Sequence, residues 1–147
     1  MKLSNRDLGY GIHRLNFLLE RLLERGLVDA PISFSAFKIL MSLHRQPEFS
    51  ARQIADFLGQ TEAGVSRQIE HLVAAGYLEA TTNASNRRQR ILTVTASGKA
   101  VGEQARIGLE ATLAPVFAEL DDTERSQLFE LIQKVTDSAH DECRQSK

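Results

Sequence analysis

Two short helical segments joined by a glycine turn are the feature that most constrains this chain. Ser50 and Thr61 are suitable N-caps for the two segments, and Gly59 between them can adopt the positive φ of a tight helix exit. The apolar residues recur at helical spacing, at Ile54, Ala55, Leu58, Val65, Ile69, Leu72 and Val73. This pattern predicts a helix-turn-helix between Ser50 and Gly76, although a purely structural helical hairpin has the same spacing.

The period of the apolar residues changes from about 3.6 to about 2 after Gly76. Residues 77–82 and 90–95 alternate as β-strands do, and the polar run 83–86 between them has the residue types of a turn. We expect Leu92 and Val94 to share the face that packs on the core. The sequence therefore predicts a β-hairpin directly behind the helix-turn-helix, which favours a winged DNA-binding unit over a structural helical hairpin.

Further helices are expected on both sides of this winged unit. Their expected positions are residues 7–27, residues 33–44, a long helix capped by Thr95, and a last helix whose capping box is Asp121 with Glu124. Pro115 should bend the long helix. The first helix has apolar residues outside its main stripe. Its apolar surface is therefore wider than packing against one neighbouring element requires, which suggests a partner. The predicted fold class is mainly α with a small β-hairpin wing.

Charge is distributed unevenly along the chain. The net charge of the whole chain is −1, but residues 31–106 carry an excess of three positive charges and residues 107–147 an excess of five negative ones. The stretch from Ala84 to Ala100 contains three arginines and one lysine and no acidic residue. Because a phosphate backbone attracts cations and repels anions, any contact with DNA is expected in the centre of the chain.

Several function classes find no support in the sequence. No long apolar run or secretory signal is present, and the single cysteine, Cys143, lies in a polar tail, so we expect a soluble, cytoplasmic protein with an exposed, unreactive thiol. The four histidines are scattered, which argues against a metal site. Because no catalytic constellation or phosphate-binding loop is recognisable, we expect neither an enzyme nor a cofactor.

Four segments resemble the MarR-type winged-helix regulators of bacteria and archaea. The segments 53–59, 63–72 and 75–79 resemble the family's helix-turn-helix and first wing strand. The segment 86–98, Asn-Arg-Arg-Gln-Arg-Ile-Leu-Thr-Val-Thr-Ala-Ser-Gly, resembles the wing signature, which is usually Asp-x-Arg followed by Leu-Thr-x-x-Gly. Order and spacing agree along the whole chain. The resemblance implies a single MarR-like domain over residues 1–147, with the winged part at 32–98 and dimerisation helices at 7–28 and 96–142.

Sequence-specific binding of double-stranded DNA is the function that this resemblance implies. The expected contact residues are Gln60, Thr61, Glu62, Ala63, Gly64, Ser66, Arg67 and His71 on the recognition helix, and Arg87, Arg88 and Arg90 in the wing. Arg67 is expected to read a guanine in the major groove, although a phosphate contact or simple solvation remains open. Arg88 matches the family arginine that enters the minor groove, and one of the three wing arginines has the alternative role of bracing the fold.

Two residues depart from the family pattern. Asn86 stands where the family usually has aspartate, so any ionic clamp to a wing arginine is weakened or lost here. Gln60 is polar at a turn position that is more often apolar, and it is expected to be free to contact phosphate.

The resemblance also implies a homodimer that binds a palindromic operator. The expected interface residues are Leu8, Ile12, Leu15, Leu19, Leu128, Leu131, Ile132 and Val135. The last four form the apolar stripe of the final helix and are expected to be its buried face. The two recognition helices would enter successive major grooves, about 34 Å apart.

A ligand-responsive repressor is the specific activity that the resemblance implies. The effector would be a small aromatic or anionic molecule, and the candidate site residues are His13, Arg14, Phe17 and Arg21 on the first helix, where surface and interface roles are alternatives. The competing function is a winged helix that binds another protein instead of DNA. Titration with DNA fragments separates the two functions, because DNA binding weakens steeply with salt.

Overall fold

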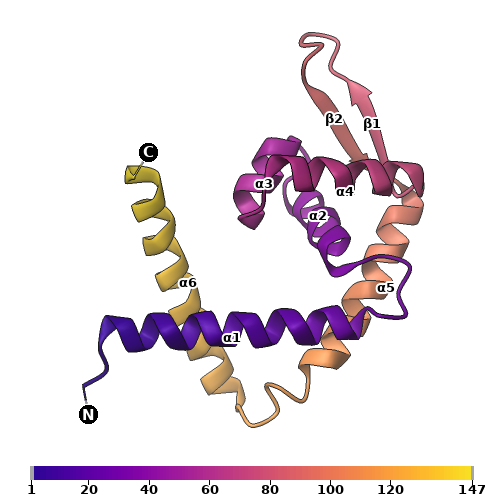
Figure 1. Ribbon diagram of the computed structural model, residues 1–147. Helices are drawn as coiled ribbons and strands as arrows, with labels where there is room; N and C mark the ends of the chain where they lie inside the picture. The colour runs from indigo at the N-terminus through magenta and orange to yellow at the C-terminus, as the bar shows by residue number, and fades with distance from the viewer. Residues whose placement is uncertain (1, 147) are drawn as a thin grey trace. The chain divides into compact units, whose positions relative to one another are not determined.

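The computed structural model describes residues 2–146, which form six helices and one two-stranded antiparallel sheet (Figure 1). The elements are α1 (Asn5–Gly26), α2 (Phe34–Arg45), α3 (Ala51–Leu58), α4 (Glu62–Ala74), β1 (Leu78–Thr82), β2 (Arg90–Val94), α5 (Ala96–Leu113) and α6 (Asp122–Gln145). They fall into two compact units, Met1–Thr112 and Leu113–Lys147. The predicted fold class, mainly helical with a small β-hairpin, is confirmed.

Local sequence signals fix the ends of α3 and α4. The Ser50 hydroxyl oxygen accepts a hydrogen bond from the Gln53 N–H at 3.3 Å, and the Gln53 side chain accepts one in return from the Ser50 N–H. The Thr61 hydroxyl oxygen accepts from the Gly64 N–H at 3.1 Å. Between the helices Gly59 has a φ of 64°, the left-handed conformation that glycine adopts without steric cost. The predicted caps and turn of the helix-turn-helix are confirmed.

The core of the first unit lies where α2, α3 and α4 meet the hairpin. The side chains with almost no exposed surface are Ile39, Leu40, Ile54, Val65, Ile69 and Leu78. In the hairpin Ala80 pairs with Leu92, and Leu92 is buried while Ile91 beside it is exposed. The face assigned to Leu92 from the alternation of the sequence is therefore correct. Figure 1 shows the hairpin projecting away from the side of α4.

Helix α1 joins this unit through its C-terminal end. Leu27, just beyond the helix, is buried, and Lys38 of α2 lies 3.6 Å from the Glu20 carboxylate. Gly26 lies so close to α5 that a Cβ on it would collide with the Thr112 side chain. The rest of α1 exposes apolar side chains, and no residue of this helix is buried among the described residues of the first unit.

Helix α5 ends where it was expected to bend. Val101, Ala105 and Leu109 are buried as the apolar stripe predicts. The helix stops at Leu113, and the N–H groups of residues 116 and 117 both donate to the Leu113 carbonyl. The predicted bend is wrong because Pro115 has no N–H for the helical ladder and disfavours the helical conformation of the residue before it.

The second unit consists of this turn and α6. The predicted capping box is confirmed: the Asp121 carboxylate accepts from the Glu124 N–H at 2.8 Å, and the Asp121 N–H donates to the Glu124 carboxylate. Arg125 donates to the carbonyls of residues 117 and 120, which holds the turn. In the described span of α6 no residue is buried, so its apolar stripe is not a buried face within one chain. Among residues 2–146 no helix is both long and apolar enough to cross a bilayer.

Candidate nucleic-acid interface

One side of α4 is buried and the other faces solvent. Val65, Ile69 and Leu72 pack inward. The recognition residues predicted from the sequence lie on the other side: Thr61, Glu62, Ala63, Arg67 and His71 are exposed, and Gln60, Gly64 and Ser66 are half-buried. Gln60 is thus less exposed than expected, and its backbone N–H is bonded to the Ala55 carbonyl at 2.9 Å. The structure brings the predicted set together on one accessible helix face.

Arg67 is the cation of this face. Its side chain is exposed, and none of the ion pairs formed within residues 2–146 includes it. The Thr61 hydroxyl oxygen is occupied by the helix cap, so its role is to hold the first turn of α4. A guanidinium without a protein partner keeps its five N–H donors available for an acceptor outside the chain.

The tip of the wing is held by hydrogen bonds between uncharged groups. The Asn83 amide nitrogen donates to the Gln89 side-chain oxygen at 3.1 Å, and the Asn83 backbone N–H donates to the Gln89 carbonyl at 2.9 Å. Asn86 uses its side-chain oxygen to accept the Arg88 backbone N–H at 3.2 Å. The residue that replaces the family aspartate therefore shapes the turn through the backbone.

The three wing arginines are free of intramolecular ion pairs. Arg87, Arg88 and Arg90 are all exposed, and within residues 2–146 no carboxylate lies in ion-pair contact with any of them. The neutral wing tip leaves their charges uncompensated. An exposed row of uncompensated guanidinium groups beside an exposed helix face is suited to bind a polyanion.

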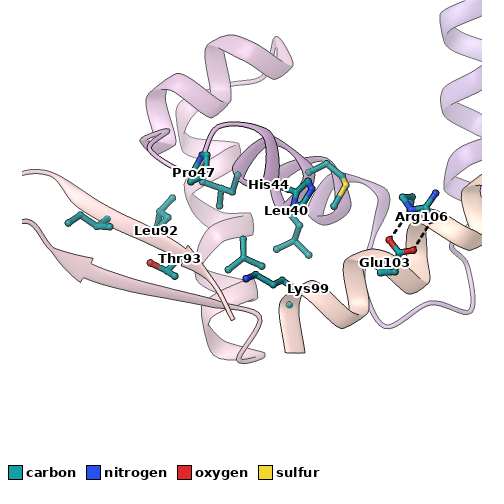
Figure 2. A pocket seen from close by; sticks show the side chains of 13 residues that line it. Leu40, His44, Pro47, Leu92, Thr93, Lys99, Glu103 and Arg106 are labelled. Atoms are coloured by element: carbon teal, nitrogen blue, oxygen red, sulfur yellow. Dashed lines mark hydrogen bonds and ion pairs between the residues drawn. The ribbon is translucent and has the colours of Figure 1, made fainter. Parts of the chain in front are cut away.

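A pocket of about 700 Å³ lies in the first unit between α2, β2 and the N-terminal half of α5 (Figure 2). Its lining is mainly apolar and comprises Leu40, Met41, Leu43, His44, Pro47, Ile91, Leu92, Thr93, Val94, Gly98, Lys99, Glu103 and Arg106. A volume of this size fits a small organic molecule. Because β2 forms one wall, an occupant of this pocket touches the wing strand directly.

Charged groups of α5 line the same pocket. Arg106 donates two hydrogen bonds to the Glu103 carboxylate, at 2.8 and 2.7 Å, which lowers the pKa of Glu103 and raises that of Arg106. This pair is drawn with dashed lines in Figure 2. Lys99 lines the pocket without an ion-pair partner among the described residues. Lys99 thus provides one unpaired positive charge in a pocket with a mainly apolar lining. This combination suits an apolar ligand with one negative charge.

The effector residues predicted from the sequence lie elsewhere. His13, Arg14, Phe17 and Arg21 are exposed on α1, with the Arg21 guanidinium 5.7 Å from the centre of the Phe17 ring, and none of them lines the pocket. Sequence reasoning missed the pocket residues of α2 and α5. The spacing of Lys99, Glu103 and Arg106 places them on one helix face, but no local signal indicates which element that face meets.

The predicted interface residues are accessible in the single chain. Leu8, Ile12 and Leu15 of α1 are each at least 45% exposed, as are Leu131, Ile132 and Val135 of α6. Leu19 and Leu128 are half-buried. Exposure of an apolar stripe to water is energetically unfavourable. Burial of these stripes of α1 and α6 against a partner would therefore be stabilising.

Comparison with known proteins finds similarity to one family of regulators. The sequence model of the MarR family matches residues 30–89, which span α2 to the end of the wing loop. The HTH-type transcriptional regulator BilQ of Clostridium symbiosum is 29% identical over 111 residues, which are 74% of this chain and 77% of BilQ. The multiple antibiotic resistance protein MarR of Escherichia coli is 28% identical over 97 residues, or 66% of this chain and 67% of that protein.

The chain is similar to members of the MarR family in sequence and in fold. Solved MarR-family structures share its fold. A regulator from Rhodococcus sp. RHA1 matches with a TM-score of 0.80 and 18% identity, covering 92% of this chain and 96% of the other. A cysteine-to-serine mutant of E. coli MarR in complex with operator DNA matches with a TM-score of 0.75 and 25% identity, covering 92% and 99%. CouR from Rhodococcus jostii, bound to p-coumaroyl-CoA, matches with a TM-score of 0.75 and 19% identity, covering 92% and 95%. The curated relatives BilQ and MarR are transcriptional regulators.

Proposed function

We propose that the protein is a homodimeric, sequence-specific DNA-binding repressor of transcription. The observation that supports it best is the exposed face of α4 next to three wing arginines that have no ion-pair partner within residues 2–146. The geometry suits α4 to the major groove, where an α-helix fits, and the wing arginines to the adjacent minor groove. The E. coli MarR structure with operator DNA supports the same assignment.

Dimerisation supplies the second half of the proposed DNA-binding unit. The exposed apolar stripes of α1 and α6 lose contact with water when two copies associate through them. A two-fold symmetric dimer presents two copies of α4, so its operator is a palindrome with half-sites about one helical turn apart. Two chains are therefore expected on each operator.

Arg67 is the residue that we assign to base readout. On a duplex selected from a random library, Arg67→Ala is expected to weaken binding by at least about 30-fold, which corresponds to about 2–6 kcal/mol for two bidentate arginine–guanine contacts, one in each half-site. Preference at one base pair of each half-site should be relaxed. Gel-shift titration of the wild type and the variant on the selected site and on single-base variants measures both effects.

The matched control for this substitution is Arg25→Ala, which removes an exposed arginine from the last turn of α1. Its affinity should equal that of the wild type. If Arg67→Ala weakens binding equally on every sequence, Arg67 contacts phosphate and does not read a base. If the wild type binds no duplex, the proposed function is wrong and the wing is a surface for another protein.

We further propose that a small anionic, mainly apolar molecule in the pocket controls DNA binding. The apolar floor and the free Lys99 ammonium support this ligand chemistry. The p-coumaroyl-CoA bound to CouR and the 6-hydroxynicotinic acid that regulates BpsR of Bordetella bronchiseptica support control of this protein by a similar class of molecule.

A screen of aromatic carboxylates by thermal shift tests this effector proposal. A ligand at about 100 times its Kd is expected to stabilise the protein by about 2.7 kcal/mol and to lower operator affinity. Lys99→Gln should abolish both effects, whereas Arg14→Gln, on the face of α1 first predicted from the sequence, should preserve them. The opposite pattern would assign the effector to α1, and a screen without any stabilising compound would contradict effector control.

A further inference from the structure

The carbonyl group that follows α4 is bound by two side chains from the start of α5. The Thr95 hydroxyl donates to the Gly76 carbonyl oxygen at 2.6 Å, and the Ser97 hydroxyl donates to the same oxygen at 2.9 Å. Gly76 has a φ of 78°, which turns the chain from the recognition helix into the wing. These hydroxyls are 19 and 21 residues away from Gly76 in the sequence, so the bonds join elements that the hairpin separates.

We call this contact between Gly76 at the end of α4 and Thr95 and Ser97 at the start of α5 the α4–α5 joint. Backbone hydrogen bonds add to the joint. The Thr95 N–H donates to the Tyr77 carbonyl at 3.1 Å, and the Tyr77 N–H donates to the Leu72 carbonyl of α4 at 2.9 Å. The Thr95 hydroxyl oxygen also accepts the Gly98 N–H at 3.0 Å, which caps α5. A Cβ on Gly98 would collide with the Tyr77 carbonyl oxygen, so the first turn of α5 packs directly against the backbone that follows α4.

The Gly76 carbonyl can accept from both hydroxyls at once. Each hydroxyl has one proton, and a carbonyl oxygen has two lone pairs, so Gly76 can accept from Thr95 and Ser97 together. The two hydroxyl oxygens also lie 3.0 Å apart, within hydrogen-bond distance of each other. Thr95 therefore has two separable roles: its proton holds the end of α4, and its lone pair caps α5.

We propose that Thr95 and Ser97 are positioning residues that fix the angle of the recognition helix relative to α5. The inference rests on the proposed function of α4 as the DNA-reading helix. The residues after Ser97 are Gly98 and Lys99, which line the pocket between α2, β2 and α5. The joint thus makes the pocket wall and the end of the recognition helix parts of one rigid body. A displacement of this part of α5 by a pocket ligand is carried to α4 through the Gly76 carbonyl.

Substitutions can separate positioning from helix capping. Thr95→Asp keeps an oxygen that accepts the Gly98 N–H but has no proton for the Gly76 carbonyl, because an ionised carboxylate is only an acceptor. Ser97→Ala removes the second donor and leaves the cap untouched. Thr95→Ser retains both roles and is the matched conservative control. The double variant Thr95→Asp/Ser97→Ala removes both donors to Gly76 while α5 stays capped.

The readout is the ratio of the affinity for the selected operator to the affinity for a random duplex of equal length. The added charge of Thr95→Asp affects both duplexes equally and cancels in this ratio. Loss of the two bonds in each protomer should lower the ratio at least about tenfold in the double variant, since each net hydrogen bond corresponds to a factor of about three to ten. Thr95→Ser should preserve the wild-type ratio, and thermal unfolding should confirm that both variants are folded.

Amide hydrogen exchange tests the joint without DNA. The last turn of α4 and the Tyr77 N–H should exchange at least about threefold faster in the double variant than in Thr95→Ser, because one net hydrogen bond has about this effect on a local opening equilibrium. Unchanged exchange together with an unchanged affinity ratio would overturn the positioning role and leave only the cap. If the wild type binds no DNA, the proposed function fails, and exchange at these amides still decides whether the joint restrains α4.

Discussion

Replacing Arg87, Arg88 and Arg90 together with alanine removes six cations from the proposed dimer and is expected to weaken DNA binding by about five orders of magnitude at about 0.1 M salt, because each lost phosphate contact contributes a salt exponent of about 0.9. The slope of the logarithm of the binding constant against the logarithm of salt concentration should become shallower by about five for the same reason. All three side chains are exposed, so the fold should be retained. Fluorescence anisotropy titrations at several salt concentrations measure both quantities.

The control for this variant removes three cations outside the winged unit. Lys2, Arg6 and Arg144 are exposed and lie near the two ends of the chain. Their joint replacement by alanine changes the net charge of the protein by the same amount. The affinity of the control should stay within about fivefold of the wild type, because none of the three side chains belongs to α4 or the wing. Equal losses in both variants would show that the wing acts only through net charge and would contradict a direct contact.

The sequence was sufficient to predict the helix-turn-helix and the wing because local chemistry determines them. Ser50 and Thr61 are caps, and Gly59 and Gly76 both adopt positive φ where the chain leaves a helix. The alternation in β2 assigned Leu92 to the core correctly. Each of these signals acts within four residues of the chain and does not depend on distant packing.

The pocket and the joint were not predictable because they depend on which elements meet. Nothing in the stretch around Lys99 indicates that it faces the wing strand and the end of α2. Thr95 was recognised as a helix cap, yet its donor bond reaches Gly76, 19 residues earlier in the chain. Ser97 carried no signal of its own. Contacts of this kind follow from tertiary packing, which a single sequence does not encode at any local position.

The terminal helices show a different reason for an incomplete prediction. Apolar spacing correctly located α1 and α6, but spacing does not say whether the apolar face is covered by the same chain or by another. The stripe of α6, expected to be a buried face, is exposed within one chain, with Leu131 at 61% and Ile132 at 49%. Pro115 was equally ambiguous, because proline can bend a helix or end it, and here the helix ends before it.

Truncating Ile69 to alanine is expected to lower the free energy of unfolding by about 2–5 kcal/mol, as buried isoleucine-to-alanine changes do in protein cores. Ile69 lies on the inner face of α4 and is only 2% exposed, so its loss leaves a cavity beneath the recognition helix. Arg67 lies two residues earlier on the outer face, and Arg67→Ala should change the free energy of unfolding by less than about 0.5 kcal/mol. Urea denaturation followed by circular dichroism measures both values.

Ile69→Val is the graded control, with an expected loss of about 0.5–1.5 kcal/mol, because it removes one methylene and leaves a smaller cavity. All variants must be compared at one protein concentration, since association of two copies makes apparent stability depend on concentration. At a temperature where Ile69→Ala is still folded, its DNA affinity should exceed that of Arg67→Ala, because the outer face of α4 is unchanged. A large loss of stability in Arg67→Ala would mean that this guanidinium braces the fold. The outer face of α4 would then contribute to stability as well as to DNA recognition.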